Sequence, residues 1–187
     1  MERQELLQKL NLSTFVAFDF ETTGLDSKND KVIEVAAIKF VDGEIENRYV
    51  ELVNPGFKIP HVITEITGIS NSMVISSPSE ELIIDDLLSF ISDYPIVAHN
   101  INFDRKFLLG MCKRLGREYK NNNEYDTLQL ARSVLFEQPV FNLGALSEYF
   151  NLSSKGAHRA ESDTENTGLI FLELLDELAK YPLDLIS

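Results

Sequence analysis

The sequence predicts an α/β domain with a mixed sheet. Three stretches near the start, residues 14–20, 32–41 and 44–53, are rich in apolar residues and are typical of strands. The second half instead alternates helical patterns with one short apolar stretch, residues 95–99. Strands followed by helix–strand–helix units indicate an α/β fold.

The first three strands are expected to form an antiparallel meander. Residues 14–20 are an almost continuous apolar and aromatic run, which favours a central strand covered on both faces. Between the second and third strands stand Asp42 and Gly43, a pair typical of a tight hairpin turn.

Helices are expected after the meander. Ser77–Glu80 has the pattern of a capping box with proline at the first helical position, which predicts a helix over about residues 79–93. A short buried strand at 95–99 should follow. Helices are then expected over about residues 102–116, 126–136, 142–150 and 160–180.

The composition indicates a soluble cytoplasmic protein with one domain spanning residues 1–187. Its 44% apolar and 25% charged residues are ordinary for a globular chain. The single cysteine, Cys112, excludes an internal disulfide framework and fits a reducing compartment. No apolar run reaches membrane-spanning length and the first residues lack a signal-peptide core, so no membrane association is expected.

The net charge of −13 argues against broad, nonspecific binding to nucleic acid. Residues 95–120 depart from this balance, with six basic residues against two acidic ones. These basic residues either follow a phosphate backbone or form a solvated helix face. The residues with both interpretations are Arg105, Lys106, Lys113, Arg114 and Arg117.

Two carboxylates end the first strand. Asp19 and Glu21 are two positions apart, so they project from the same face of the strand. Adjacent carboxylates repel each other, and hard divalent cations such as Mg²⁺ prefer such oxygen ligands. The pattern indicates either a metal site or a solvated strand end.

Two further carboxylates have both a functional and a structural interpretation. Asp104 lies in the first turn of a helix, where an acid favours the helix dipole, but its helix follows a strand that could neighbour the first. Asp163 leads the apolar face of the last helix and so points inward. His158 lies just before that helix, where it is either a catalytic group or a solvated histidine.

Taken together, DFETTG, HNINFD and HRAESD resemble the three motifs of the DEDDh family of 3′–5′ exonucleases, which includes the proofreading subunit of bacterial DNA polymerase III. The resemblance extends over about residues 14–175. The spacing of His158 and Asp163 matches the histidine branch, because the tyrosine of the other branch would stand at Arg159.

The resemblance implies an RNase H-like fold: a mixed five-stranded sheet, with strands 1–3 antiparallel and strands 4 and 5 parallel, flanked by helices. It implies two divalent cations, Mg²⁺ or Mn²⁺, held by the carboxylates and a general base at His158. The expected metal ligands are Asp19, Glu21, Asp104 and Asp163.

Substrate contacts are also expected from the resemblance. In similar enzymes the turn after the first strand contacts the terminal nucleotide, and an aromatic side chain can stack on a base. The residues concerned are Thr22, Thr23, Gly24, Leu25, Asn100 and Phe103. Gly24 also fits a plain turn, Asn100 a loop and Phe103 the core. Glu34, among apolar residues of the second strand, either faces the metals or is a polar strand position.

The sequence thus favours a 3′–5′ exonuclease that acts on single-stranded DNA in replication or repair and releases nucleoside 5′-monophosphates. The alternatives are an enzyme that degrades RNA or short oligonucleotides, and a non-catalytic module of a polymerase or helicase complex. Residues 8–12 loosely resemble a sliding-clamp-binding peptide, although they fit a lead into the first strand better.

Overall fold

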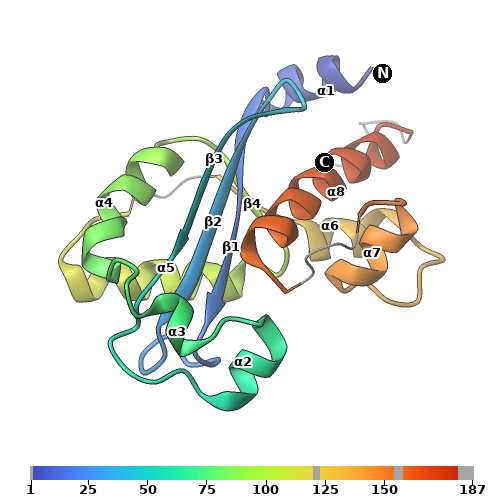
Figure 1. Ribbon diagram of the computed structural model, residues 1–187. Coiled ribbons are helices and arrows are strands. Elements are labelled where there is room, and N and C mark those ends of the chain that lie inside the picture. The colour runs from blue at the N-terminus through green and yellow to red at the C-terminus, as the bar shows by residue number, and fades with distance from the viewer. Residues whose placement is uncertain (1, 120–122, 154–157, 181–187) are drawn as a thin grey trace.

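The computed structural model describes residues 2–119, 123–153 and 158–180. Its centre is one five-stranded sheet in the order β3-β2-β1-β4-β5 (Figure 1). Strands β1 to β3 pair antiparallel, and β4 and β5 extend the sheet in parallel beside β1. The strands are β1 (Thr14–Thr22), β2 (Val32–Val41), β3 (Glu44–Leu52), β4 (Ile96–Ala98) and β5 (Glu124–Asp126). The predicted mixed sheet is confirmed.

Helices cover both faces of the sheet (Figure 1). On one face, α8 (Ala160–Leu178) packs against β1 and β2, and α6 (Thr127–Val134) and α7 (Leu143–Tyr149) pack on α8. On the other face lie α4 (Glu80–Ile91) and α5 (Asn102–Leu115). These five helices agree with the predicted ones to within a few residues at each end.

Alternation along β1 sends consecutive side chains to different layers. Val16, Phe18 and Phe20 enter the core beneath α4 and α5. Phe15 and Ala17 enter the core beneath α8, where the Phe15 ring stacks on Phe40 at 4.9 Å between centroids. Asp19 and Glu21 continue this second series, so they face the layer of α8.

The close approach of α8 to the sheet depends on Gly168. A Cβ atom at this position would lie 2.3 Å from the ring of Phe40, which is too close for any side chain. The glycine therefore lets the helix lie directly on β2. This contact brings the first turn of α8, which carries Asp163, against the end of β1.

The start of α4 differs from the prediction. The cap residue is Ser79, whose side chain makes no capping hydrogen bond, and Glu80 rather than Pro78 is the first helical residue. The carbonyl of Pro78 instead accepts a hydrogen bond from the Asn54 amide at 2.8 Å. The predicted capping box is wrong because Pro78 is still paired with Asn54, and the helix begins only after this contact.

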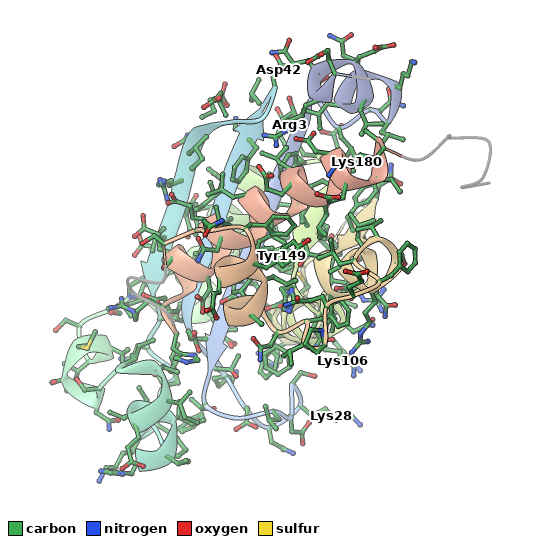
Figure 2. All side chains as sticks on the ribbon, turned by 90° about the vertical axis from the view of Figure 1, so that its right-hand side faces the viewer. Arg3, Lys28, Asp42, Lys106, Tyr149 and Lys180 are labelled. Carbon is green, nitrogen blue, oxygen red and sulfur yellow. The ribbon has the colours of Figure 1, made fainter. Side chains whose placement is uncertain are left out.

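Three short helices were not predicted: α1 (Arg3–Lys9), α2 (His61–Thr67) and α3 (Asn71–Val74). Helices α2 and α3 lie at the end of the sheet where β1 ends (Figure 1). In α1, Arg3 donates hydrogen bonds to Asp176 of α8. Figure 2 shows Arg3 close to Lys180, which follows the end of α8. Residues 8–12, which loosely resemble a sliding-clamp-binding peptide, therefore begin inside a docked helix, and their Leu12 is fully buried. None of the described helices is long and apolar enough to cross a membrane.

Candidate active site

The end of β1 presents Asp19 and Glu21 toward the first turn of α8. In the antiparallel pairing with β2, Asp19 lies opposite Ala36 and Glu21 opposite Glu34. The small side chain of Ala36 leaves space beside Asp19, whereas Glu34 adds a third carboxylate to the same face. The sequence thus concentrates negative charge where two central strands meet the helix.

Asp163 completes the cluster from α8. Oxygen atoms of Asp19, Glu21 and Asp163 all lie within 4.8 Å of one another. Each of the three side chains is partly exposed, so the cluster is open to solvent on one side. Two of these carboxylates come from one strand and the third from a helix more than 140 positions later in the chain.

Burial and mutual repulsion make these carboxylates hard to ionise. Removal from water, followed by the charges of Asp163 and Glu34, raises the pKa of Asp19 to about 7. Removal from water and the charge of Asp19 raise the pKa of Glu21 to about 8. Burial likewise raises the pKa of Asp163, against the hydrogen bond it accepts from the His158 amide.

The cluster fits divalent cations. Among the described residues, no lysine or arginine forms an ion pair with Asp19, Glu21 or Asp163. Three converging carboxylates without a basic partner are costly, and a hard cation with oxygen ligands offsets that cost. The donor set of oxygen atoms is the one that Mg²⁺ and Mn²⁺ prefer.

Asp104 approaches the same strand end from α5 but stands apart from the three-carboxylate cluster. It is 2% exposed, and its Oδ1 accepts a hydrogen bond from the Phe20 amide at 3.0 Å. Burial, followed by the nearby charge of Asp19, raises its pKa well above the ordinary value. The structure therefore places Asp104 within electrostatic reach of Asp19, with one oxygen already held by the backbone.

His158 lies directly before α8, as expected, with an exposed side chain. Its φ of +65° is in the left-handed region, which is uncommon for a residue with a side chain. The His158 amide donates to Asp163 Oδ2 at 3.1 Å, which fixes the backbone of the histidine beside the cluster. The preceding residues 154–157 lie outside the described part of the chain.

Glu34 makes contacts that the sequence left open. It is 1% exposed, and its carboxylate accepts two-pronged hydrogen bonds from Arg159, with Nε 3.0 Å from Oε2. Its Oε2 also accepts from the Ala160 amide at 2.9 Å. Of the two interpretations, the structure favours a group next to the carboxylate cluster over a solvent-facing strand position. Arg159 had no predicted role, because 125 positions separate it from Glu34.

The turn after β1 is closed by its own polar groups. The Thr22 hydroxyl donates to the Gly24 carbonyl at 2.6 Å, and the Thr23 hydroxyl donates to Asp30 at 3.1 Å. Gly24 is needed here because a Cβ would lie 2.3 Å from the Asp30 carboxylate. Both threonines are buried, whereas Leu25 is 86% exposed at the tip. Leu25 is thus the side chain of this turn that is free to contact a ligand.

Asn100 and Phe103 lie around the start of α5. Asn100 is exposed, has a φ of +65°, and its amide donates to Asp126 at 3.0 Å, which holds the loop. Phe103 is partly buried, with its ring 5.1 Å from that of Phe107. Both alternatives stated for these residues, loop and core support or substrate contact, remain compatible with these positions.

Most of the basic residues of α5 and its end are engaged within the protein. Arg105 pairs with Glu124, Arg114 with Glu80 and Arg117 with Asp85, at 2.6 to 3.0 Å. The structure therefore favours a structural role for these three arginines over backbone tracking. Lys106 lies at the same end of the molecule as Lys28 of the turn (Figure 2).

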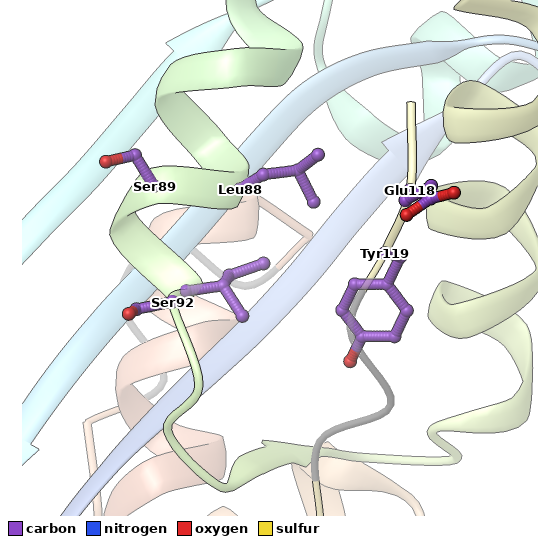
Figure 3. Close-up of a pocket in the computed structure, with 6 residues that line it drawn as sticks. Leu88, Ser89, Ser92, Glu118 and Tyr119 are labelled. Atoms are coloured by element: carbon purple, nitrogen blue, oxygen red, sulfur yellow. The ribbon is translucent and has the colours of Figure 1, made fainter. Parts of the chain in front are cut away.

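Two cavities are relevant to the search for a ligand site. One of about 450 Å³ opens beside His158 and Asp163 and is also lined by Asn142, Gly144 and Asn166. Sequence patterns did not indicate these lining residues, because they come from the start of α7 and from α8. A second cavity of about 240 Å³ lies between the end of α4 and Tyr119, away from the carboxylates (Figure 3).

Comparison with known proteins agrees with this arrangement. The family model described as "Exonuclease" matches residues 16–171. The chain is 37% identical over 174 residues to the 3′-5′ exonuclease DinG of Bacillus subtilis, covering 92% of this chain and 19% of that protein. It is 35% identical over 165 residues to the DNA polymerase III subunit epsilon of Aquifex aeolicus, covering 88% and 82%.

A third relative is the PolC-type DNA polymerase III of Caldanaerobacter subterraneus, 36% identical, with 92% of this chain and 12% of that protein covered. The chain thus spans less than a fifth of the PolC and DinG relatives. Among solved structures, the fold is shared with exonuclease X bound to 5′-overhanging duplex DNA, with a TM-score of 0.69 and 24% identity over 90% of this chain and 94% of that one. It is also shared with E. coli exonuclease I bound to a dA16 oligonucleotide, with a TM-score of 0.76 and 20% identity over 90% and 43%.

Proposed function

This chain belongs to the exonuclease family, and we propose on that basis that it is a metal-dependent 3′–5′ exonuclease acting on single-stranded DNA. The observation that carries the proposal is the convergence of Asp19, Glu21 and Asp163 without a basic partner among the described residues. The 3′–5′ direction is supported by the Bacillus subtilis relative, which is named a 3′-5′ exonuclease.

The proposed reaction is hydrolysis of the last phosphodiester bond of the strand. The oxygen of a water molecule bonds to phosphorus, and the bond from phosphorus to the 3′ oxygen of the preceding nucleotide breaks. The products are a nucleoside 5′-monophosphate and a strand one nucleotide shorter that ends in a 3′ hydroxyl. His158 accepts a proton of the attacking water, since imidazole is the side chain suited to proton transfer near neutrality, and the departing 3′ oxygen takes up a proton from solvent to become the hydroxyl.

The metal ligands of the proposal are Asp19, Glu21, Asp163 and Asp104. When bound, two cations, Mg²⁺ or Mn²⁺, supply charge neutralisation at the phosphate and make water more acidic. Asp104 would contribute through its Oδ2, because Oδ1 is held by the Phe20 amide. Leu25, exposed on the turn after β1, packs on the terminal nucleotide, with support from backbone groups of Thr22, Thr23 and Gly24 and from Asn100 and Phe103.

The protein's acidic balance bears on how the substrate arrives. The net charge is −13, three of the basic residues near α5 are paired internally, and the described part of the chain presents no broad basic track. We therefore propose that it acts in the cytoplasm on short strands, or on ends delivered by a polymerase, helicase or sliding clamp. Strong, salt-sensitive binding of long single strands by the chain alone, with long processive runs, would contradict this part of the proposal.

The test is a digestion of 5′-labelled single-stranded DNA and of RNA of the same sequence. Each is incubated with the purified chain and Mg²⁺, Mn²⁺ or EDTA, beside Asp19→Asn and the matched surface variant Asp85→Asn. The proposal predicts a ladder that shortens from the 3′ end, needs a divalent cation, is lost in Asp19→Asn and is retained in Asp85→Asn. A stronger ladder on RNA would move the substrate class to RNA, and no ladder with either metal would indicate a non-catalytic module.

A further inference from the structure

A buried glutamate next to the site is bound entirely to the segment that carries the histidine. The Glu34 carboxylate is 1% exposed, and its hydrogen bonds go to the guanidinium of Arg159 and the amide of Ala160. Its other electrostatic neighbours are the carboxylates of the cluster. Glu34 lies on β2, so these bonds connect the central sheet to two consecutive residues that follow His158.

The two residues bound by Glu34 determine where the backbone of His158 lies. Arg159 is the cap residue of α8 with an extended backbone, and His158 precedes it with a left-handed φ of +65°. The His158 amide is in turn bonded to Asp163 in the first turn of the helix. The segment is thus held on one side by its own helix and on the other by the sheet.

The position of Glu34 is electrostatically unfavourable without this role. It lies directly opposite Glu21 in the sheet and contributes to the repulsion felt by Asp19, Glu21 and Asp163. Like charges directly opposite in a strand pair are destabilising, and a buried carboxylate is costly without good partners. An apolar residue here would avoid both costs.

The helix itself does not depend on Glu34 to dock on the sheet. Gly168 allows α8 to pack directly on Phe40, and Arg48 of β3 pairs with Glu165 of α8 at 2.7 Å. What Glu34 adds is an anchor one residue away from His158. Arg159 also serves as its counter-charge with a planar, two-pronged geometry that a lysine cannot reproduce.

We propose that Glu34 and Arg159 are positioning residues that hold the backbone of His158 so that its imidazole is presented beside the carboxylate cluster. This inference rests on the proposed function, in which His158 accepts the proton of the attacking water. Neither residue touches the substrate or a metal; both act through the histidine.

The first test is a double-mutant cycle of Glu34→Gln and His158→Ala in single-turnover digestion of labelled DNA with Mg²⁺. Loss of a partner that orients an active group costs about 10- to 100-fold in activity. We therefore expect Glu34→Gln to lower kcat about 10- to 100-fold and to change KM less than about threefold. In the His158→Ala background, Glu34→Gln should change kcat less than about threefold, because the residue through which it acts is absent. Arg159→Lys should match Glu34→Gln.

The same cycle distinguishes the possible failures. An equal loss from Glu34→Gln in both backgrounds, a change confined to KM, or no change in the parent would overturn the positioning role. An inactive parent chain would instead overturn the proposed function and the positioning role with it. An active His158→Ala variant with the rate of the parent would show that the histidine is not the base, and the positioning role would fall while the exonuclease assignment stands.

Two measurements without turnover separate positioning from metal binding and folding. Titration with Mn²⁺ should give affinities for Glu34→Gln within about threefold of the parent, and a loss of tenfold or more would overturn action through the histidine. Hydrogen exchange at Arg159 and Ala160 should be faster in Glu34→Gln, and unchanged exchange would contradict the anchor. Arg48→Gln is the matched control: it removes another sheet-to-α8 ion pair and should leave kcat within about twofold of the parent.

Discussion

The buried carboxylate at the start of α4 and the carboxylates at the end of β1 differ in their partners. Glu80, at the start of α4, is 5% exposed and accepts three hydrogen bonds from Arg114 and one from Lys31, at 2.8 to 3.3 Å. At the end of β1, Asp19 and Glu21 meet Asp163 without an ion pair to any described basic residue. The first carboxylate has basic partners from the protein itself, whereas the second group consists of carboxylates that face one another.

The difference is one of pairing with basic side chains. Glu80 ties α4 to α5 and to the chain before β2, and its charge is balanced by two cations of the protein itself. The carboxylates of β1 form no ion pair with a described basic residue, and burial together with repulsion raises the pKa of Asp19 to about 7 and of Glu21 to about 8, although the charge of Arg159 acts in the opposite direction on Glu21. Carboxylates whose pKa values are strongly raised in this way occur more often at functional sites than elsewhere, which supports the proposed metal site.

The largest expected difference is in activity. Asp19→Asn should reduce the Mg²⁺-dependent rate by at least about 10³-fold, since metal-borne charge stabilisation is worth several kcal/mol at the transition state. The same variant should not lower the free energy of unfolding, because it removes repulsion rather than a partner. Rate measurements and thermal unfolding of one preparation check both expectations; a large loss of stability would mean that Asp19 is structural.

The next effect is in stability at the paired site. Glu80→Gln should lower the free energy of unfolding by about 3 kcal/mol, because it leaves two half-buried cations without their partner. Denaturant titration measures the change. A loss below about 0.5 kcal/mol would show that the pair at Glu80 contributes no more than a surface salt bridge, and the contrast between the two groups would weaken.

The pH dependence of the apo protein should sharpen the contrast. A carboxyl group whose pKa is raised by folding stabilises the fold below its unfolded value and loses that contribution as the pH rises through its folded value. For Asp19 and Glu21 the window runs from about pH 4 to about pH 8. We expect the free energy of unfolding in EDTA to fall by several kcal/mol across this window because of these two groups.

A divalent cation should reverse that loss. Because ions bind the deprotonated carboxylates of the folded state, Mn²⁺ should raise the melting temperature more at pH 8 than at pH 5. Asp19→Asn should show a smaller loss with pH in EDTA and little response to Mn²⁺. Identical pH profiles for the parent and the variant would contradict the account of the cluster.

The smallest predicted effect concerns the exposed turn next to the cluster. Leu25→Ala should raise KM for single-stranded DNA about three- to tenfold, since one apolar contact contributes about 1 kcal/mol, and should leave kcat nearly unchanged. Steady-state kinetics on a short oligonucleotide measure the split. Leu82→Ala, at a similarly exposed leucine on α4, is the control and should change neither constant.

The sequence was a good guide where a pattern is local. The apolar run of β1, the Asp42–Gly43 turn and the helical spacing of α5 and α8 are all present as predicted. The pairing of Asp19 with Glu21 follows from strand geometry, and the inward face of Asp163 from helical spacing. These residues could be placed because each pattern is complete within about one turn or strand.

What was missed depends on distant partners. Helix α1 is short and is stabilised by burial of Leu6 and Leu7 and by contacts of Arg3 with the end of α8. Strand β5 has only three residues, too few for a pattern. The ion pair between Glu34 and Arg159 joins residues that are 125 positions apart in the chain. No property of either residue alone indicates this pairing.

We propose that the carboxylates at the end of β1 form a metal site. Calorimetric titration of the EDTA-stripped protein with Mn²⁺ at pH 8 is the direct test of this site. We expect saturable binding of Mn²⁺ by the parent chain and by Glu80→Gln, and loss of this binding in Asp19→Asn. An absence of saturable binding by the parent chain, or binding of equal strength in Asp19→Asn, would contradict it.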